Sequence, residues 1–191
     1  FSEKAVFDIS AQSDTSQLTP IRDSVGTVIE KFDRAQSNEG DSKGLTTGLA
    51  GLDNALNGLH RTDLILIAAR PAMGKTSLAM NIVENAATLA GATCAVFSLE
   101  MSKEQIAQRM LCSLAEVPMS QALRGQLKDD KAWARLWKTS AELEKSKIFI
   151  DDSTLITPAE MLSKCRRLKA RYGLDLVMVD YIQLMTGGGR A

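Results

Sequence analysis

Residues 63–80 read DLILIAARPAMGKTSLAM, and this stretch decides how the chain can fold. Its apolar run, Leu64 to Ala69, has the length and composition of a short buried strand. A tight loop over residues 70–74 follows, and Lys75 then begins a run whose apolar residues recur at helical spacing. These residues are Leu78, Ile82, Val83, Ala86 and Leu89. The stretch is therefore predicted to form a strand, a loop and a helix in direct succession.

A loop that runs into a helix beginning with Gly-Lys-Thr is suited to binding phosphate groups. Backbone N–H groups at a helix start have no acceptor within the helix, and the helix dipole adds positive potential there. Lys75 can reach the terminal phosphates of a nucleotide, and the Thr76 hydroxyl can ligate Mg²⁺. The residues expected to bind the nucleotide are Ala72, Met73, Gly74, Lys75, Thr76 and Ser77.

The loop departs from the usual G-x-x-x-x-G-K-[ST] pattern in one position. The first Gly of that pattern would stand at position 69, where this chain has Ala69. The loop also contains Pro71, which fixes φ and removes a hydrogen-bond donor. The alternative interpretation is a simple strand-to-helix turn with a solvated Lys75. The predicted strand before the loop and the helix after it favour the phosphate-binding interpretation.

Composition limits the class of protein. The 191 residues are 45% hydrophobic, which suits one globular domain with its own core. The 23 basic and 23 acidic residues balance, which argues against a generally basic nucleic-acid coat but permits local DNA contacts. Three dispersed cysteines suit a reducing compartment, and no apolar run approaches the length of a membrane span. No signal peptide is recognisable, so a cytoplasmic location without membrane contact is expected.

The N-terminal part is expected to be a linker. Residues 1–10 can form a short helix with its apolar residues near one face, and residues 11–17 are polar, so residues 1–17 are assigned as a linker helix and linker. From Thr19 and Pro20 a second helix begins, with an apolar stripe at helical spacing. Residues 18–191 are assigned to one nucleotide-binding domain. The chain starts without Met, and it is expected to be a piece of a longer protein.

Further strands and helices follow along the chain. Residues 93–99 are expected to form a second buried strand, ending at Glu100, before a helix with a capping box at residues 102–105. Glu100 then stands at the carboxyl end of a strand, where open α/β sheets bind ligands. Residues 129–145 are expected to be helical, and residues 147–150 to form a third strand. Trp133 and Trp137, one helical turn apart, are expected to pack in the core or against another subunit.

A second capping box, at residues 157–160, predicts a helix. Its apolar positions, expected to be buried, are Met161, Leu162, Cys165 and Leu168, and Lys164, Arg167 and Arg171 are expected to lie on a solvated face. An apolar strand, residues 174–178 and onward, then ends at Asp180. A carboxylate at this place can hold Mg²⁺ through its water shell opposite the phosphate loop. The alternative for Asp180 is an acidic residue that merely ends a buried strand.

The segments ARPAMGKTS (69–77), SLEMS (98–102) and LVMVDYIQLM (176–185), in this order, resemble the C-terminal ATPase domain of the DnaB-type bacterial replicative DNA helicases. The resemblance extends over nearly the whole chain, and Ala69 in place of Gly is usual in that family. It implies an α/β, RecA-like P-loop NTPase fold with a mostly parallel sheet, helices on both faces and a preceding linker helix. It also implies a hexameric ring, joined through the helix at 1–10, that hydrolyses ATP while translocating on single-stranded DNA.

The resemblance also implies roles for single residues. Lys75 would bind the β- and γ-phosphates of ATP, and Thr76 and Asp180 would hold Mg²⁺. Glu100 would be the catalytic carboxylate that orients the attacking water, and the alternative for Glu100 is a surface residue just before a helix cap. Primase and a helicase loader are the implied protein partners. An arginine finger and DNA-binding loops would come from sequence beyond residue 191. Since such a finger contributes a rate factor of ~10³–10⁵ in related NTPases, this fragment alone is expected to be nearly inactive.

Two other interpretations fit the same residues. A RecA-like ATPase of the recombination, repair or clock type would share the fold, the phosphate loop and Glu100, and differs in lacking DNA unwinding. A non-catalytic assembly module would act through residues 1–10 and would not need Lys75.

Overall fold

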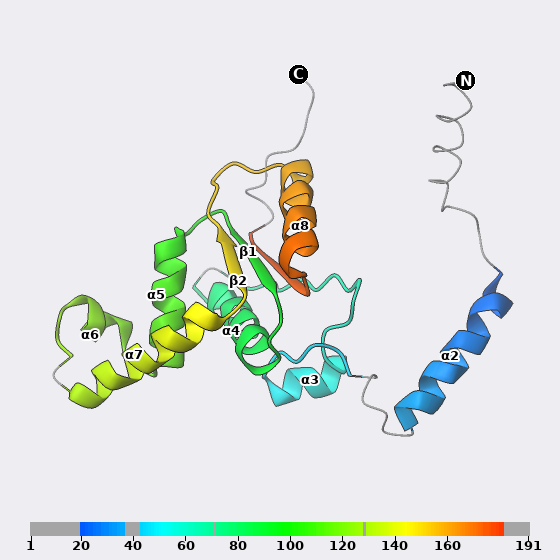
Figure 1. Ribbon diagram of the computed structural model, residues 1–191, viewed down its shortest axis with the longest axis horizontal. Coiled ribbons are helices and arrows are strands. Elements are labelled where there is room, and N and C mark those ends of the chain that lie inside the picture. Colours follow the sequence, from blue (N-terminus) through cyan, green and yellow to red (C-terminus); the bar gives the residue numbers. More distant parts are fainter. Residues whose placement is uncertain (1–19, 37–42, 71, 128, 182–191) are drawn as a thin grey trace, which may run out of the picture. The chain divides into compact units, whose positions relative to one another are not determined.

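The structure, a computed structural model, describes residues 20–36, 43–70, 72–127 and 129–181 (Figure 1). The chain divides into two compact units, residues 1–42 and 43–191. The predicted helix within residues 1–10 lies outside the described residues. No helix among the described residues is both long and apolar enough to cross a membrane.

In the first unit, the described residues form helix α2, Ile21–Gln36, as its apolar stripe predicts. Pro20 directly precedes the first helical residue, where its fixed φ and missing N–H are tolerated. All the apolar stripe residues are exposed: Ile21, Val25, Val28, Ile29 and Phe32. Such a stripe is typical of a helix that packs against another surface.

A parallel sheet of three strands organises the described part of the second unit. Strand β1 (Cys94–Ser98) lies between β2 (Ile148–Asp151) and β3 (Leu176–Asp180), and both pairings are parallel. All five residues of β1 are buried, as expected of a central parallel strand. The register pairs Ser98 with Asp180, so the carboxyl ends of β1 and β3 meet at one edge.

Helices cover both faces of this sheet, as predicted. Helices α4 (Lys75–Leu89) and α5 (Lys103–Leu114) pack on one face, and α8 (Pro158–Tyr172) packs on the other (Figure 1). The first core contains Met80, Val83, Ala86, Cys94, Val96, Ile106, Met110 and Met178. The second contains Ala95, Phe97, Leu99 and Ile156, with Met161, Cys165 and Leu168 against it. Alternate residues of β1 enter opposite cores, as the period of a strand requires.

The predicted strand at Leu64–Ala69 is wrong for the described structure, because these residues form no strand. Leu64 is 83% exposed and Leu66 is 71% exposed. A strand needs a partner with free backbone groups. Among the described residues β2 and β3 each pair on one side only, so an outer edge is open on both, but residues 64–69 pair with neither strand. Apolar composition identifies a segment able to form a strand but not the edge that would receive it.

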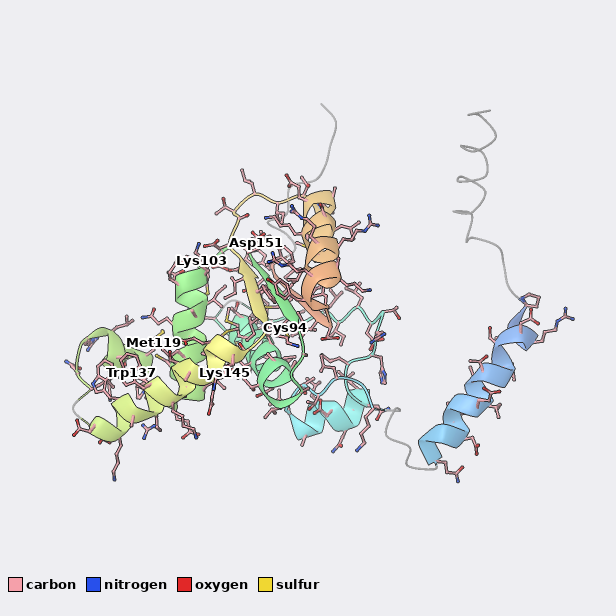
Figure 2. The ribbon with its side chains drawn as sticks, viewed as in Figure 1. Cys94, Lys103, Met119, Trp137, Lys145 and Asp151 are labelled. Carbon is pink, nitrogen blue, oxygen red and sulfur yellow. The ribbon has the colours of Figure 1, made fainter. Side chains whose placement is uncertain are left out.

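Both predicted capping boxes are present and set the starts of two helices. The Ser102 hydroxyl oxygen accepts a hydrogen bond from the Gln105 N–H, and the Ser102 N–H donates to the Gln105 side-chain oxygen, at the start of α5. Thr157 and Glu160 make the same exchange at α8. The α5 start is also tied to β2, since the Lys103 N–H donates to Asp152 at 3.1 Å. Lys103 and Asp151 accordingly lie at the same edge in Figure 2.

A small helical cluster forms beyond α5. Helices α6 (Met119–Leu123) and α7 (Asp130–Lys145) bury Val117, Ala132 and Leu136 together. The two tryptophans of α7 are not in this core, since Trp133 is 48% exposed and Trp137 is 70% exposed. The core alternative for these residues is therefore wrong, because Ala132 and Leu136 occupy the inward side of the helix. Trp137 is labelled on α7 in Figure 2.

The segment that leads to the phosphate loop is anchored by Asp53, in helix α3 (Ala50–Leu56). Its carboxylate accepts hydrogen bonds from the Thr46 hydroxyl (2.5 Å) and from the Thr47 hydroxyl (2.6 Å) and N–H (2.8 Å). These bonds hold the pKa of Asp53 below its usual value. The Asn85 side chain, from α4, donates to the Thr47 carbonyl at 2.9 Å. The lead-in segment is thus tied to the helix that follows the phosphate loop.

Glu84 is the exception among the inward residues of α4, because it is a carboxyl group only 3% exposed. Burial raises the pKa of Glu84 to about 7, against an opposing hydrogen bond from Ser113. Folding therefore favours the protonated form. Below about pH 4.5 the carboxyl is protonated in both states, and burying it costs no ionisation energy. Between about pH 4.5 and 7 the free energy of unfolding falls as the pH rises, because only the unfolded state loses the proton. Above about pH 7 this loss of stability stays constant.

We expect Glu84→Gln to stabilise the protein at pH 8 by about 2–3 kcal/mol and to change little at pH 4.5, because the amide carries no charge to bury. Denaturant unfolding at the two pH values measures this difference. Glu142→Gln, at an exposed position of α7, is the matched control and should change stability little at either pH. Equal effects of Glu84→Gln at both pH values would contradict the assignment.

Candidate nucleotide-binding site

The loop over residues 70–74 turns through two left-handed backbone positions. Ala72 has φ of +64° and Gly74 has φ of +84°. Gly74 immediately precedes α4, and glycine takes this conformation without the strain of a side chain. A turn of this kind directs successive N–H groups toward one side at the start of a helix. The described part of the predicted phosphate loop is therefore compatible with a turn that presents N–H groups at the start of α4.

The first two residues of α4 meet the end of β3. The Thr76 hydroxyl donates to Asp180 Oδ2 at 2.6 Å, and the Lys75 ammonium lies 3.0 Å from Asp180 Oδ1. Asp180 is 104 positions from Thr76 in sequence, and the fold brings them into contact. The carboxylate is nearly buried, with a side chain 5% exposed, whereas Lys75 is 30% exposed. Three predicted site residues are thus assembled into one hydrogen-bonded group.

Glu100 follows β1 at the same edge of the sheet. The Leu99 N–H donates to the Asp180 carbonyl at 2.9 Å, which extends the pairing of β1 with β3 as far as the residue before Glu100. The buried Ser98 hydroxyl donates to the Met101 carbonyl at 2.8 Å and accepts from its N–H at 3.1 Å. This turn fixes the backbone on both sides of Glu100, whose own side chain is exposed. Glu100 is therefore positioned at the edge that carries Asp180.

The donor set fits a magnesium ion held mainly by phosphate and water. The Thr76 hydroxyl and the Asp180 carboxylate supply adjacent hard oxygen atoms, which Mg²⁺ prefers. The described residues contain no cluster of three or more His, Cys, Asp or Glu side chains able to hold a metal alone. Mg²⁺ commonly keeps several waters and uses one or two protein ligands beside substrate phosphates. The group at Asp180 meets that requirement.

One neighbour of Lys75 was missed by the sequence reasoning. The Lys75 ammonium lies over the ring of Tyr181, 4.4 Å from the ring centroid. The only available signal was the position of Tyr181 directly after Asp180, at the end of an apolar strand. The contact adds an aromatic face to the surroundings of Lys75.

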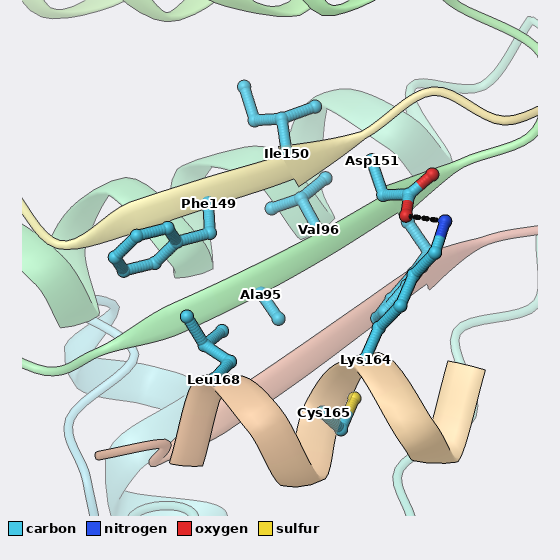
Figure 3. Close-up of a pocket in the computed structure, with 9 residues that line it drawn as sticks. Ala95, Val96, Phe149, Ile150, Asp151, Lys164, Cys165 and Leu168 are labelled. Carbon is cyan, nitrogen blue, oxygen red and sulfur yellow. Dashed lines mark hydrogen bonds and ion pairs between the residues drawn. The ribbon is translucent and has the colours of Figure 1, made fainter. Parts of the chain in front are cut away.

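A second acid–base pair lies at the end of β2, where sequence reasoning expected Lys164 on a solvated face. Lys164 instead forms an ion pair with Asp151, beside a cavity of about 160 Å³ between α8 and the sheet (Figure 3). Burial would raise the pKa of Asp151, but hydrogen bonds from Lys164 and Ser153 outweigh this effect and hold the pKa below its usual value.

Leu162, also in α8, was expected to be buried, but it is 50% exposed.

This cavity is apart from the predicted nucleotide site. Its lining is largely apolar and includes Ala95, Phe149 and Leu168, and no residue of the phosphate loop contributes to it. Phosphate recognition requires N–H groups and cations rather than such a lining. The cavity therefore does not share the charged and hydroxyl groups of Lys75, Thr76 and Asp180.

The parallel sheet with helices on both faces, and a phosphate loop facing the end of β3, define a RecA-like ATPase domain fold. Solved structures support this class. The chain is similar to "ATPase Domain of G40P", with a TM-score of 0.79 and 28% identity, over 91% of this chain and 61% of that one. It is also similar to "The Structure Of A DnaB-Like Replicative Helicase And Its Interactions With Primase", with a TM-score of 0.77 and 27% identity, over 97% of this chain and 44% of that one.

The chain belongs to the family described as the DnaB-like helicase C terminal domain, which matches residues 44–191. It is 37% identical over 189 residues to the replicative DNA helicase DnaC of Bacillus subtilis, covering 99% of this chain and 41% of that protein. It is 43% identical over 192 residues to the replicative DNA helicase DnaB of Buchnera aphidicola subsp. Schizaphis graminum, covering 97% of this chain and 41% of that protein. The chain thus spans about two fifths of the length of these relatives. The resemblance inferred from the three motifs is confirmed.

Proposed function

We propose that this chain is the ATP-hydrolysing motor part of a replicative DNA helicase. The observation that carries the proposal is the contact of Asp180 with both Lys75 and Thr76. Phosphoryl transfer depends on positioning and on neutralising charge more than on covalent help from the protein. A lysine, a hydroxyl and a buried carboxylate beside a helix N-terminus supply those functions.

Each residue has a distinct role in this proposal. The N–H groups over residues 72–77 bind the phosphates, and Lys75 neutralises the β- and γ-phosphates. Thr76 and Asp180 would hold Mg²⁺, which would neutralise the charge of the phosphate oxygens when bound. Glu100, exposed at the end of β1, accepts a proton from the attacking water and orients it.

The proposal extends to the partners. Both relatives compared above are named replicative DNA helicases, and one similar structure concerns interactions with primase. We propose single-stranded DNA as the track, a hexameric ring as the working state, and primase and a loader as partners, in the cytoplasm. The exposed apolar stripe of α2 supports self-association, since unpaired stripes of this kind are typical of interfaces. We also propose that the helix within residues 1–10 joins neighbouring subunits of this ring.

Steady-state ATP hydrolysis by the full-length protein, with and without single-stranded DNA, tests this function. We expect DNA to stimulate hydrolysis several-fold, because the motor couples the two sites, and we expect no hydrolysis from Lys75→Ala. Hydrolysis that ignores DNA would instead support a RecA-like ATPase without helicase activity. Hydrolysis that is equal in the wild type and in Lys75→Ala would contradict the assignment of the site.

A further inference from the structure

Among the described residues, the Lys75 ammonium contacts two groups. One is Asp180 Oδ1, at 3.0 Å, and the other is the face of the Tyr181 ring, 4.4 Å from its centroid. An ammonium over an aromatic face is attracted by the ring quadrupole, more strongly where water is partly excluded. Both the Lys75 side chain (30% exposed) and Tyr181 are partly shielded from solvent. The contact therefore stabilises this particular position of Lys75.

The same arrangement occupies the other groups of the proposed site. Asp180 uses one carboxylate oxygen for Lys75 and the other for the Thr76 hydroxyl. A nucleotide with Mg²⁺ needs Lys75 at its phosphates and the Thr76 oxygen at the metal. Lys75 must then exchange at least part of its present contacts for contacts with phosphate. Any contact that is lost in this exchange opposes nucleotide binding.

We propose, on the basis of the nucleotide-binding function above, that Tyr181 is a positioning residue that holds Lys75 back on Asp180 until a nucleotide is bound. Tyr181 lies next to Asp180 in the chain, so its ring and the carboxylate act on the same ammonium from neighbouring positions. Of these two described contacts, removing the ring leaves the one with Asp180, which lowers the cost of moving Lys75. The ring thus sets nucleotide affinity without touching the nucleotide.

The test is the dissociation constant of Mg-ADP, measured by calorimetry on the full-length protein. We expect Tyr181→Leu to bind Mg-ADP about two- to fivefold more tightly than the wild type, which corresponds to the strength of one exposed cation–π contact. Tyr181→Phe keeps the aromatic face and should retain the wild-type affinity. Tyr181→Met also lacks the ring and carries the same expectation as Tyr181→Leu if the leucine variant does not fold.

A double-mutant cycle separates this role from a merely structural one. In a Lys75→Ala background there is no ammonium to hold, so Tyr181→Leu should leave the dissociation constant unchanged. The same tightening in that background would overturn the proposal, and so would unchanged or weaker binding by Tyr181→Leu in the otherwise wild-type protein. A Tyr181→Phe variant that binds as tightly as Tyr181→Leu would also overturn it, because the ring face would then be irrelevant.

The outcome also distinguishes this inference from the function on which it rests. If the wild type binds Mg-ADP and Lys75→Ala binds it more weakly, the nucleotide site stands, whatever Tyr181→Leu does. If the wild type binds no Mg-ADP, the proposed function fails and the role of Tyr181 fails with it.

Discussion

Glu100→Gln should reduce the rate of ATP hydrolysis by about 10²–10⁴-fold, which is the usual contribution of a general base. The amide keeps the shape of the side chain but cannot take a proton from water. Glu100 is exposed and has no contact with Lys75, Thr76 or Asp180 among the described interactions. Nucleotide affinity should therefore stay within a small factor of the wild-type value.

Single-turnover hydrolysis and Mg-ATP binding, measured on the same preparation, separate these two effects. Glu104→Gln is the matched control, since Glu104 is an exposed carboxylate four positions further on, in the first turn of α5. It should hydrolyse ATP at nearly the wild-type rate. A Glu100→Gln protein with normal turnover would assign the water-activating role to a different group.

Asp180→Asn should raise the Mg²⁺ concentration needed for hydrolysis by about 10–100-fold, as is common for groups that hold a metal through its outer shell. The amide oxygen can still accept the hydrogen bond from Thr76, so the fold should persist. The negative charge that attracts both Mg²⁺ and Lys75 is lost. Titration of hydrolysis with Mg²⁺ at saturating ATP measures the shift.

The chain contains a close control for this variant. Asp151 also ends a strand of the sheet and also pairs with a lysine, Lys164, but it lies away from the phosphate loop. Asp151→Asn should therefore leave the Mg²⁺ requirement unchanged while removing a comparable ion pair. If both variants shift the Mg²⁺ requirement equally, Asp180 has no special relation to the metal.

Much of the fold follows from short-range patterns. The two capping boxes, at Ser102 and Thr157, predicted the starts of α5 and α8 because the bonding partners lie three residues apart. The continuous apolar run of β1 predicted a central buried strand, and the helical periodicity predicted α2 and α4. The contact of Lys75 and Thr76 with Asp180 agrees with the predicted placement of Asp180 opposite the phosphate loop, although the described structure has no strand before that loop.

The errors share a physical cause, which is that burial depends on partners distant in sequence. Residues 64–69 are apolar enough for a strand, but composition does not decide whether they pair with an edge of the sheet, and in the described structure they pair with none. Trp133 and Trp137 occupy a helix whose inward side is already filled by Ala132 and Leu136. The partners of Lys164 and Tyr181 are likewise contacts between separate elements, which the periodicity of a single element does not encode.

The hydrogen bond from the Leu99 N–H to the Asp180 carbonyl limits how far these two parts of the backbone can move relative to each other. It joins the backbone beside Glu100 to the backbone of Asp180. The backbone positions of Glu100 and Asp180 are therefore fixed relative to each other. Reactive groups must be held within fractions of an ångström of their working positions, and sites built on strands achieve this better than sites built on loops. A movement of α4 relative to the sheet would therefore shift Lys75 and Thr76 against a fixed pair of acids. Under the proposed function, a displacement of α4 would therefore change the alignment of the reacting groups directly.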